Sequence, residues 1–210
     1  MACQPTPIRA LVVDYGEVLC HPADPERLEE MAGYAGVPLT PFLGAYWELR
    51  EPYDRGILDG PAYWSSVGAA TGTRLDAERI RGLVERDIAL WTNLDEEMVS
   101  WVEAVAGRGV RVGLLSNMVP EIGAYVRDTL GFHRGFTDVT YSFEVGLVKP
   151  EPEIYRRALA GLAAAPQETL FVDDRPPNVE GARAVGMYAH LFRGRDELLS
   201  AIERCYALGR

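Results

Sequence analysis

The chain has 210 residues and a formal net charge of −10, with 48% hydrophobic and 25% charged residues. This composition is typical of a globular protein with one substantial core, or with a core and a smaller insert. The acidic balance and the lack of a lysine or arginine run argue against a surface for nucleic acid or another polyanion.

No apolar run approaches the ~18 residues that a membrane span requires, so no membrane partner is expected. The three cysteines, Cys3, Cys20 and Cys205, are scattered and match neither a disulfide framework nor metal-ligand spacing. This pattern favours a reducing compartment, and we expect a cytoplasmic protein. Nothing in the sequence indicates the oligomeric state.

Five apolar runs predict strands, at residues 8–14, 110–116, 139–143, 169–173 and 187–192. Helical periodicity separates the later runs. Residues 120–130 carry Ile122, Val126 and Leu130 at every fourth position, and residues 151–162 repeat this spacing. Alternating strands and helices of this length predict an α/β protein, with a parallel sheet covered by helices on both faces.

Residues 24–91 depart from this alternation and predict four consecutive helices. Each begins at an N-cap residue, a helix-starting proline or both: Asp24-Pro25, Thr40-Pro41, Gly60-Pro61 and Asp76. The sequence therefore predicts a helical module inserted directly after the first strand.

Several polar side chains follow the predicted strands, where parallel strands would bring them to one edge of the sheet. They are Asp14, Ser116, Asn117, Lys149, Asp173 and Asp174. A carboxylate in such a place can act as a nucleophile. Two adjacent acids repel each other unless a cation lies nearby. Each residue alone is equally typical of a turn or loop, so the argument depends on their order and spacing together.

In chain order, the stretches VVDYGEVL, LLSNM, LVKPEPEIY and FVDDRPPN resemble the four motifs of the haloacid dehalogenase-like hydrolase superfamily. The resemblance is to subfamily I, whose helical cap follows the first strand, and it extends from residue 8 to residue 192. It implies a Rossmann-like three-layer α/β/α core formed by residues 1–22 and 93–210. Residues 23–92 would form the inserted four-helix cap.

The resemblance also implies a role for each motif residue. Asp14 matches the nucleophile and, with the Gly16 carbonyl and Asp174, the ligands of Mg²⁺, while Asp173 matches an acid that acts on the metal through water. Ser116, Asn117 and Lys149 match the residues that hold the phosphoryl group, with Ser116 and Lys149 also counted as catalytic. The implied function is Mg²⁺-dependent hydrolysis of small phosphorylated metabolites through an aspartyl-phosphate intermediate.

Gly16 departs from the pattern, because most phosphatases of this superfamily carry a second aspartate there. That acid protonates the leaving oxygen, and such help is typically worth ~10²–10⁴ in rate. Similar phosphatases with glycine include those acting on sugar 1-phosphates, whose anomeric hydroxyl is a better leaving group. Glu17 and His21 are candidate substitutes for the acid.

Two other functions remain open from the sequence. Dehalogenases of the superfamily also lack the second aspartate, but they need no metal and generally lose an acid from the last motif. A non-catalytic interaction protein could keep the fold, although it would have no reason to retain the clustered charges. The cap residues that would contact a substrate are not defined. The polar or aromatic candidates are Arg50, Tyr53, Arg55, Tyr63 and Trp64.

Overall fold

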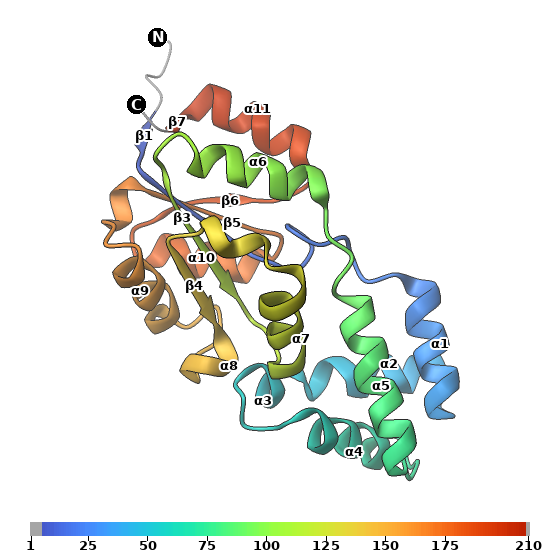
Figure 1. Cartoon of the computed structure of the whole chain (residues 1–210). Coiled ribbons are helices and arrows are strands. Elements are labelled where there is room, and N and C mark those ends of the chain that lie inside the picture. Colours follow the sequence, from blue (N-terminus) through green and yellow to red (C-terminus); the bar gives the residue numbers. More distant parts are fainter. Residues whose placement is uncertain (1–5, 209–210) are drawn as a thin grey trace.

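The computed structural model describes residues 6–208 and contains a five-stranded parallel sheet (Figure 1). The strand order is β4-β3-β2-β5-β6. The strands are β2 (Ala10–Val13), β3 (Arg111–Ser116), β4 (Asp138–Tyr141), β5 (Thr169–Asp173) and β6 (Tyr188–Leu191). All five predicted strands are present, and the central position of β2 places Asp14 in the middle of the sheet edge.

The apolar runs form strands because both faces of the sheet are covered. Leu11 and Val13 pack into a cluster with helices α6 (Glu96–Ala106), α7 (Pro120–Tyr125) and α11 (Arg195–Cys205). Ala10 and Val12 point the other way, into a cluster with α9 (Pro152–Gly161) and α10 (Pro176–Ala184). Because neighbouring strand residues alternate between the two clusters, the predicted three-layer α/β/α core is confirmed.

Smaller elements complete the core. The predicted strand 8–14 is interrupted at Arg9. Its first residue, Ile8, belongs to β1 (Thr6–Ile8), which pairs in parallel with β7 (Tyr206–Leu208) in a separate two-stranded sheet. The predicted helix 120–130 continues beyond α7 as a π-helical segment, η1 (Val126–Leu130). Short helical segments follow at η2 (Phe132–Gly135), α8 (Ser142–Val145) and η3 (Pro166–Glu168).

Between β2 and α6 the chain forms the helical insert, which has five helices rather than the expected four. They are α1 (Pro25–Ala35), α2 (Leu39–Glu48), α3 (Arg50–Asp54), α4 (Gly60–Ala70) and α5 (Ala77–Leu90). The additional helix, α3, has five residues and follows α2 after Leu49 alone. A helix this short has too few residues to show a 3.6-residue period, so the sequence pattern did not separate it.

The start signals of the insert are only partly those expected. Asp24 and Asp76 cap α1 and α5, as predicted, and Asp59 caps α4 by accepting the Ala62 N–H. Helix α2 begins at Leu39, so Thr40 lies inside its first turn and makes no capping hydrogen bond. Pro41 is tolerated there because the N–H groups of a first turn have no intrahelical partner.

Two antiparallel segments connect the insert to the sheet. The His21 N–H donates to the Asn93 carbonyl at 2.9 Å, and the Asp95 N–H donates to the Leu19 carbonyl at 3.0 Å. Both links lie within two or three residues of the predicted boundaries at 22/23 and 92/93. The division into a core of residues 1–22 and 93–210 and a cap of residues 23–92 stays a prediction.

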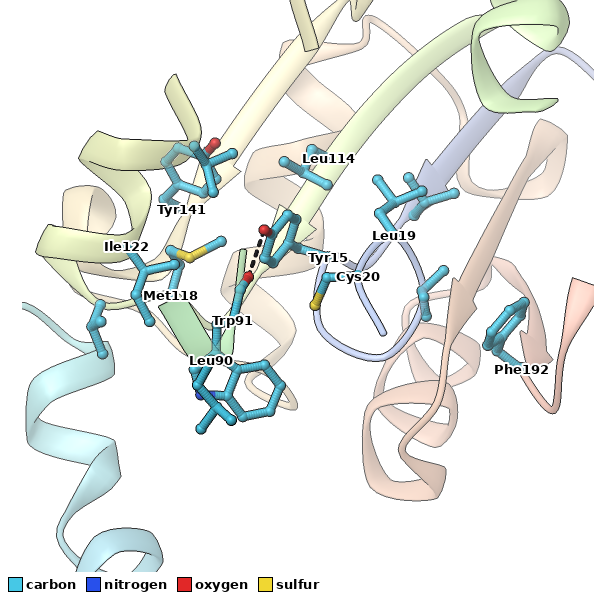
Figure 2. Packing of buried hydrophobic residues seen from close by; sticks show 14 of the residues in the cluster. Tyr15, Leu19, Cys20, Leu90, Trp91, Leu114, Met118, Ile122, Tyr141 and Phe192 are labelled. Atoms are coloured by element: carbon cyan, nitrogen blue, oxygen red, sulfur yellow. Dashed lines mark hydrogen bonds between the residues drawn. The ribbon is translucent and has the colours of Figure 1, made fainter. Parts of the chain in front are cut away.

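Tyr15 anchors the loop that follows β2. Its hydroxyl donates to the Trp91 carbonyl at 2.7 Å, and its ring is almost fully buried. Figure 2 shows this hydrogen bond and the packing of Tyr15 near Leu114 and Cys20. The loop that carries Asp14 and Gly16 is therefore tied to the end of the insert.

Residues 6–208 include two of the three cysteines and all the helices that the structure describes. No helix in this range is both long and apolar enough to cross a bilayer. Cys20 and Cys205 are free thiols, and Cys3 lies outside the described residues. Burial raises the pKa of the Cys20 thiol to about 12, which makes it a poor nucleophile at neutral pH.

Candidate active site

A cleft of about 570 Å³ lies between the carboxyl ends of the strands and the helical insert. Asp14 follows β2, Ser116 ends β3, and Asp174 follows β5, so the parallel sheet brings all three to one edge. The cleft is lined by six of the seven residues assigned roles from the sequence motifs: Asp14, Gly16, Ser116, Asn117, Lys149 and Asp174. The seventh, Asp173, is fully buried directly behind them.

Lys149 joins two of the carboxylates. Its Nζ lies 2.7 Å from Asp14 Oδ1 and 2.7 Å from Asp173 Oδ2, and all three side chains are buried. Burial alone would lower the pKa of Lys149, but the two carboxylates outweigh that effect and raise it. The ammonium is therefore charged at neutral pH and held beside Asp14.

Asp14 is a carboxylate in an unfavourable environment. Its burial raises its pKa to about 7, because the loss of water outweighs the attraction of Lys149, and Asp173 adds repulsion. Oδ1 accepts hydrogen bonds from Lys149 and from the Tyr15 N–H at 2.7 Å. The ionised form would be favoured by a further positive charge in the cleft.

Asp173 is satisfied by donors of the protein itself. Oδ1 accepts from the Arg175 N–H at 2.8 Å and from Asn178 Nδ2 at 3.0 Å. Oδ2 accepts from Lys149 Nζ at 2.7 Å and from Asn178 at 3.1 Å. With both oxygens engaged, Asp173 is placed to orient Lys149 rather than to bind a ligand directly.

Asp174 lacks such partners. No ion pair to its carboxylate is formed within residues 6–208, and burial together with repulsion from Asp173 and Glu17 raises its pKa to about 6. Carboxylate oxygens of Asp14, Asp173 and Asp174 all lie within 4.8 Å of one another. Oxygens at this spacing suit a hard cation such as Mg²⁺, which binds oxygen ligands at ~2.0–2.1 Å. The arrangement therefore fits a metal ion held by Asp14 and Asp174.

The side chains of Ser116 and Asn117 make different hydrogen bonds. The Ser116 hydroxyl is buried beside the cleft, with only a long contact of 3.4 Å to the Asn117 carbonyl. The Asn117 amide instead binds the backbone of Lys149. Nδ2 donates to the Lys149 carbonyl at 3.1 Å, and Oδ1 accepts from the Lys149 N–H at 2.8 Å. Asn117 also lines the cleft, so its predicted contact with the substrate stays a prediction, and its hydrogen bonds make it in addition a positioning residue for Lys149.

We expect Asn117→Ala to destabilise the fold by about 1–3 kcal/mol, because both backbone groups of Lys149 lose their partner in a half-buried setting. Displacing Lys149 should also lower kcat for phosphate esters by about 100-fold. Urea unfolding and steady-state kinetics measure the two effects. Asn93→Ala removes an exposed amide with no side-chain hydrogen bond and serves as the control. An unchanged stability with a raised KM alone would point to direct substrate contact instead.

The insert supplies the opposite wall of the cleft. Arg50 lines it, as the sequence suggested, but Tyr53, Tyr63 and Trp64 are buried in the insert. Arg55 lies outside the cleft lining and pairs with Glu51 and Glu151. The sequence did not single out four other lining residues from this part of the chain, Trp47, Glu51, Asp54 and Trp91. Their helical spacing is that of ordinary core or surface positions, so no sequence signal distinguished them.

Comparison with known proteins shows the family and agrees with the fold. The family model for haloacid dehalogenase-like hydrolases matches residues 8–186. The chain belongs to this family of hydrolases, as the four motifs indicated. The assignment to subfamily I and to its sugar 1-phosphate subgroup stays a prediction.

Among relatives, a phosphoserine phosphatase of Thermus thermophilus is 39% identical over 83 residues, which is 39% of this chain and 33% of that protein. The alignment thus spans about a third of that relative's length. A sesquiterpene phosphatase of Aspergillus oryzae is 27% identical over 140 residues, 67% of this chain and 70% of that protein.

Solved structures share the fold at low identity. A haloacid dehalogenase-like enzyme of Bacteroides thetaiotaomicron, also solved with magnesium and inorganic phosphate, superimposes with a TM-score of 0.75. Its identity is 20%, over 92% of this chain and 98% of that one. The L-2-haloacid dehalogenase of Xanthobacter autotrophicus superimposes with a TM-score of 0.63 and 21% identity, over 92% and 81% of the two chains.

Proposed function

We propose that this chain is a Mg²⁺-dependent phosphatase of small phosphate monoesters that works through an aspartyl-phosphate intermediate. The observation that carries the proposal is the cluster of Asp14, Asp174 and Lys149 in one cleft, which pairs two carboxylates for a cation with an ammonium for an anion. The phosphatase relatives and the magnesium and phosphate complex of the Bacteroides enzyme support it.

Each residue has a distinct part in this reaction. A carboxylate oxygen of Asp14 attacks phosphorus, and Lys149 Nζ and the Tyr15 N–H, both bonded to Oδ1, orient the carboxylate. An oxygen–phosphorus bond forms as the ester bond breaks, and the leaving oxygen departs with a proton from solvent. Water then hydrolyses the aspartyl phosphate to inorganic phosphate and restores Asp14. Lys149 and the Ser116 hydroxyl hold the phosphoryl oxygens during both steps.

The proposed metal ligands are Asp14, Asp174 and the Gly16 carbonyl, with Asp173 acting indirectly. Bound Mg²⁺ would supply positive charge next to the transferring phosphoryl group. The nature of the leaving group is inferred from position 16. Gly16 provides no acid, so sugar 1-phosphates, whose leaving oxygen is less basic, are the favoured substrates.

We expect Asp174→Asn to raise the Mg²⁺ concentration needed for half-maximal phosphate release by at least about tenfold, because one charged ligand is lost. A Mg²⁺ titration of phosphate release measures this. Asp95→Asn, an exchange at the N-cap of α6 outside the cleft lining, is the control. An Asp174→Asn variant with an unchanged Mg²⁺ requirement would remove Asp174 from the metal site.

The rival function is hydrolysis of 2-haloacids, which Gly16 and the shared fold of the Xanthobacter enzyme both allow. The two functions differ in their products and in their need for metal. Halide release from 2-chloropropionate in excess chelator, without phosphate release from any ester, would establish the rival. The retained pair Asp173 and Asp174 favours the phosphatase.

A further inference from the structure

The cleft extends beyond the space that a phosphoryl group needs. Its volume of about 570 Å³ falls within the ~300–1,000 Å³ of pockets that hold whole small molecules. The motif residues occupy the wall at the sheet edge, whereas Trp47, Arg50 and Asp54 lie on α2 and α3 of the insert. These three side chains therefore form a separate wall, available to the part of a substrate beyond its phosphate.

Arg50 is fixed in place on this wall. Its Nη1 lies 2.9 Å from Asp87 Oδ2 and its Nε lies 3.5 Å from Asp54 Oδ1. The guanidinium also lies over the ring of Tyr46, 5.1 Å from its centroid. Only 12% of the Arg50 side chain and 15% of the Asp54 side chain are exposed. What remains accessible is an oriented donor beside an oriented acceptor.

The charges of this wall restrict what can bind there. Glu51 and Asp54 line the cleft beside Arg50, and buried Asp87 pairs with Arg50, whereas Arg175 lines the cleft from the sheet edge. On the insert side the carboxylates outnumber the guanidinium, so a second anionic group on the substrate is disfavoured there. An ammonium group could donate to Asp54, but it cannot accept from the N–H groups of Arg50, so it would satisfy only one of the two residues. A hydroxyl group both donates and accepts, so it can satisfy Arg50 and Asp54 at once.

Trp47 adds an apolar surface next to this pair. Its side chain is 48% exposed although it lines the cleft, and its ring meets that of Trp91 edge-on at 6.1 Å between centroids. An aromatic surface beside a few fixed polar groups is the usual composition of a small-molecule subsite. It matches a ligand with an apolar C–H face and several hydroxyl groups.

We propose that Trp47, Arg50 and Asp54 form a subsite for an uncharged, polyhydroxylated leaving group, such as a sugar, on the phosphate ester. The inference rests on the proposed phosphatase function and adds the residues that select among its substrates. Trp47 packs against the carbon skeleton, Arg50 donates hydrogen bonds to hydroxyl oxygens, and Asp54 accepts a hydrogen bond from a hydroxyl group. Asp87 is a positioning residue that holds Arg50.

The test compares glucose 1-phosphate with acetyl phosphate, whose small leaving group cannot reach the insert wall. We expect Trp47→Ala to lower kcat/KM for glucose 1-phosphate about tenfold more than kcat/KM for acetyl phosphate. Asp54→Asn, which keeps the size but loses the charged acceptor, should shift the ratio in the same direction. Tyr188→Ala removes another exposed aromatic side chain outside the cleft lining and should leave the ratio unchanged.

The outcomes separate the two proposals. Equal losses on both substrates in Trp47→Ala and Asp54→Asn, or no loss, would overturn the subsite. So would a wild-type preference for phosphoserine or phosphoethanolamine over glucose 1-phosphate, while leaving the phosphatase function intact. If the wild-type protein with Mg²⁺ released no phosphate even from acetyl phosphate, the phosphatase function would fail, and the subsite with it. Thermal unfolding of each variant shows that it is folded.

Discussion

Replacing Asp14 with Asn is expected to abolish phosphate release from every ester, with a loss of about 10⁴-fold or more. The neutral amide cannot attack phosphorus to form the acyl phosphate. It also removes one of the two carboxylates that pair with Lys149. The fold should persist, because asparagine has the same size and keeps an oxygen that can accept the Tyr15 N–H.

Asp196→Asn is the matched control for this experiment. The Asp196 side chain is 96% exposed, so its replacement removes one negative charge without touching the cleft. Steady-state phosphate release and thermal unfolding should be measured for both variants. If Asp14→Asn kept more than a small fraction of wild-type activity while remaining folded, another residue would have to be the nucleophile.

Restoring an acid at position 16 is expected to have the opposite effect on poor substrates. Gly16→Asp should raise kcat/KM for simple alkyl phosphates by about 10²–10⁴, because a general acid can then protonate the leaving oxygen. The structure has room for the side chain: a Cβ at Gly16 would meet only Trp91 Cζ3 at 3.9 Å, and the backbone there does not have a positive φ. The gain on sugar 1-phosphates should be much smaller.

The same experiment examines possible substitutes for the missing acid. Glu17 lines the cleft, is exposed, and has a left-handed φ of 56°, whereas His21 is outside the cleft lining. Glu17→Gln should therefore be assayed beside Gly16→Asp. A wild-type protein that cleaves alkyl and anomeric phosphates equally well would contradict the leaving-group argument. A loss of alkyl phosphate cleavage in Glu17→Gln would identify Glu17 as the group that protonates the leaving oxygen.

Most of the core was predictable because its signals are local. The central strands β2, β3 and β5 are apolar runs buried on both faces, and the carboxyl ends of parallel strands must share one edge, which placed Asp14, Ser116 and Asp174 together. The N-caps Asp24 and Asp76 also act within one helical turn. Features of this kind depend on residues close in sequence and on a general rule of sheet geometry.

Other features depend on contacts between distant residues and gave no local signal. Asn117 pairs with the backbone of Lys149 across 32 positions, and Arg50 pairs with Asp87 across 37 positions. The short helix α3, which carries Arg50 and Asp54, follows α2 after a single residue, so the sequence pattern did not distinguish it from α2. Buried polar pairs form only after the insert has packed, so the second wall of the cleft could be described only from the structure.

The proposed chemistry is tested most directly by phosphate release from a panel of phosphate monoesters with Mg²⁺ and with excess chelator. The proposal predicts release that requires Mg²⁺, is highest for acetyl phosphate and sugar 1-phosphates, and is far lower for alkyl phosphates and sugar 6-phosphates. Release that persists in excess chelator, or no release from any ester with Mg²⁺ present, would contradict a Mg²⁺-dependent phosphatase built on Asp14, Lys149 and Asp174.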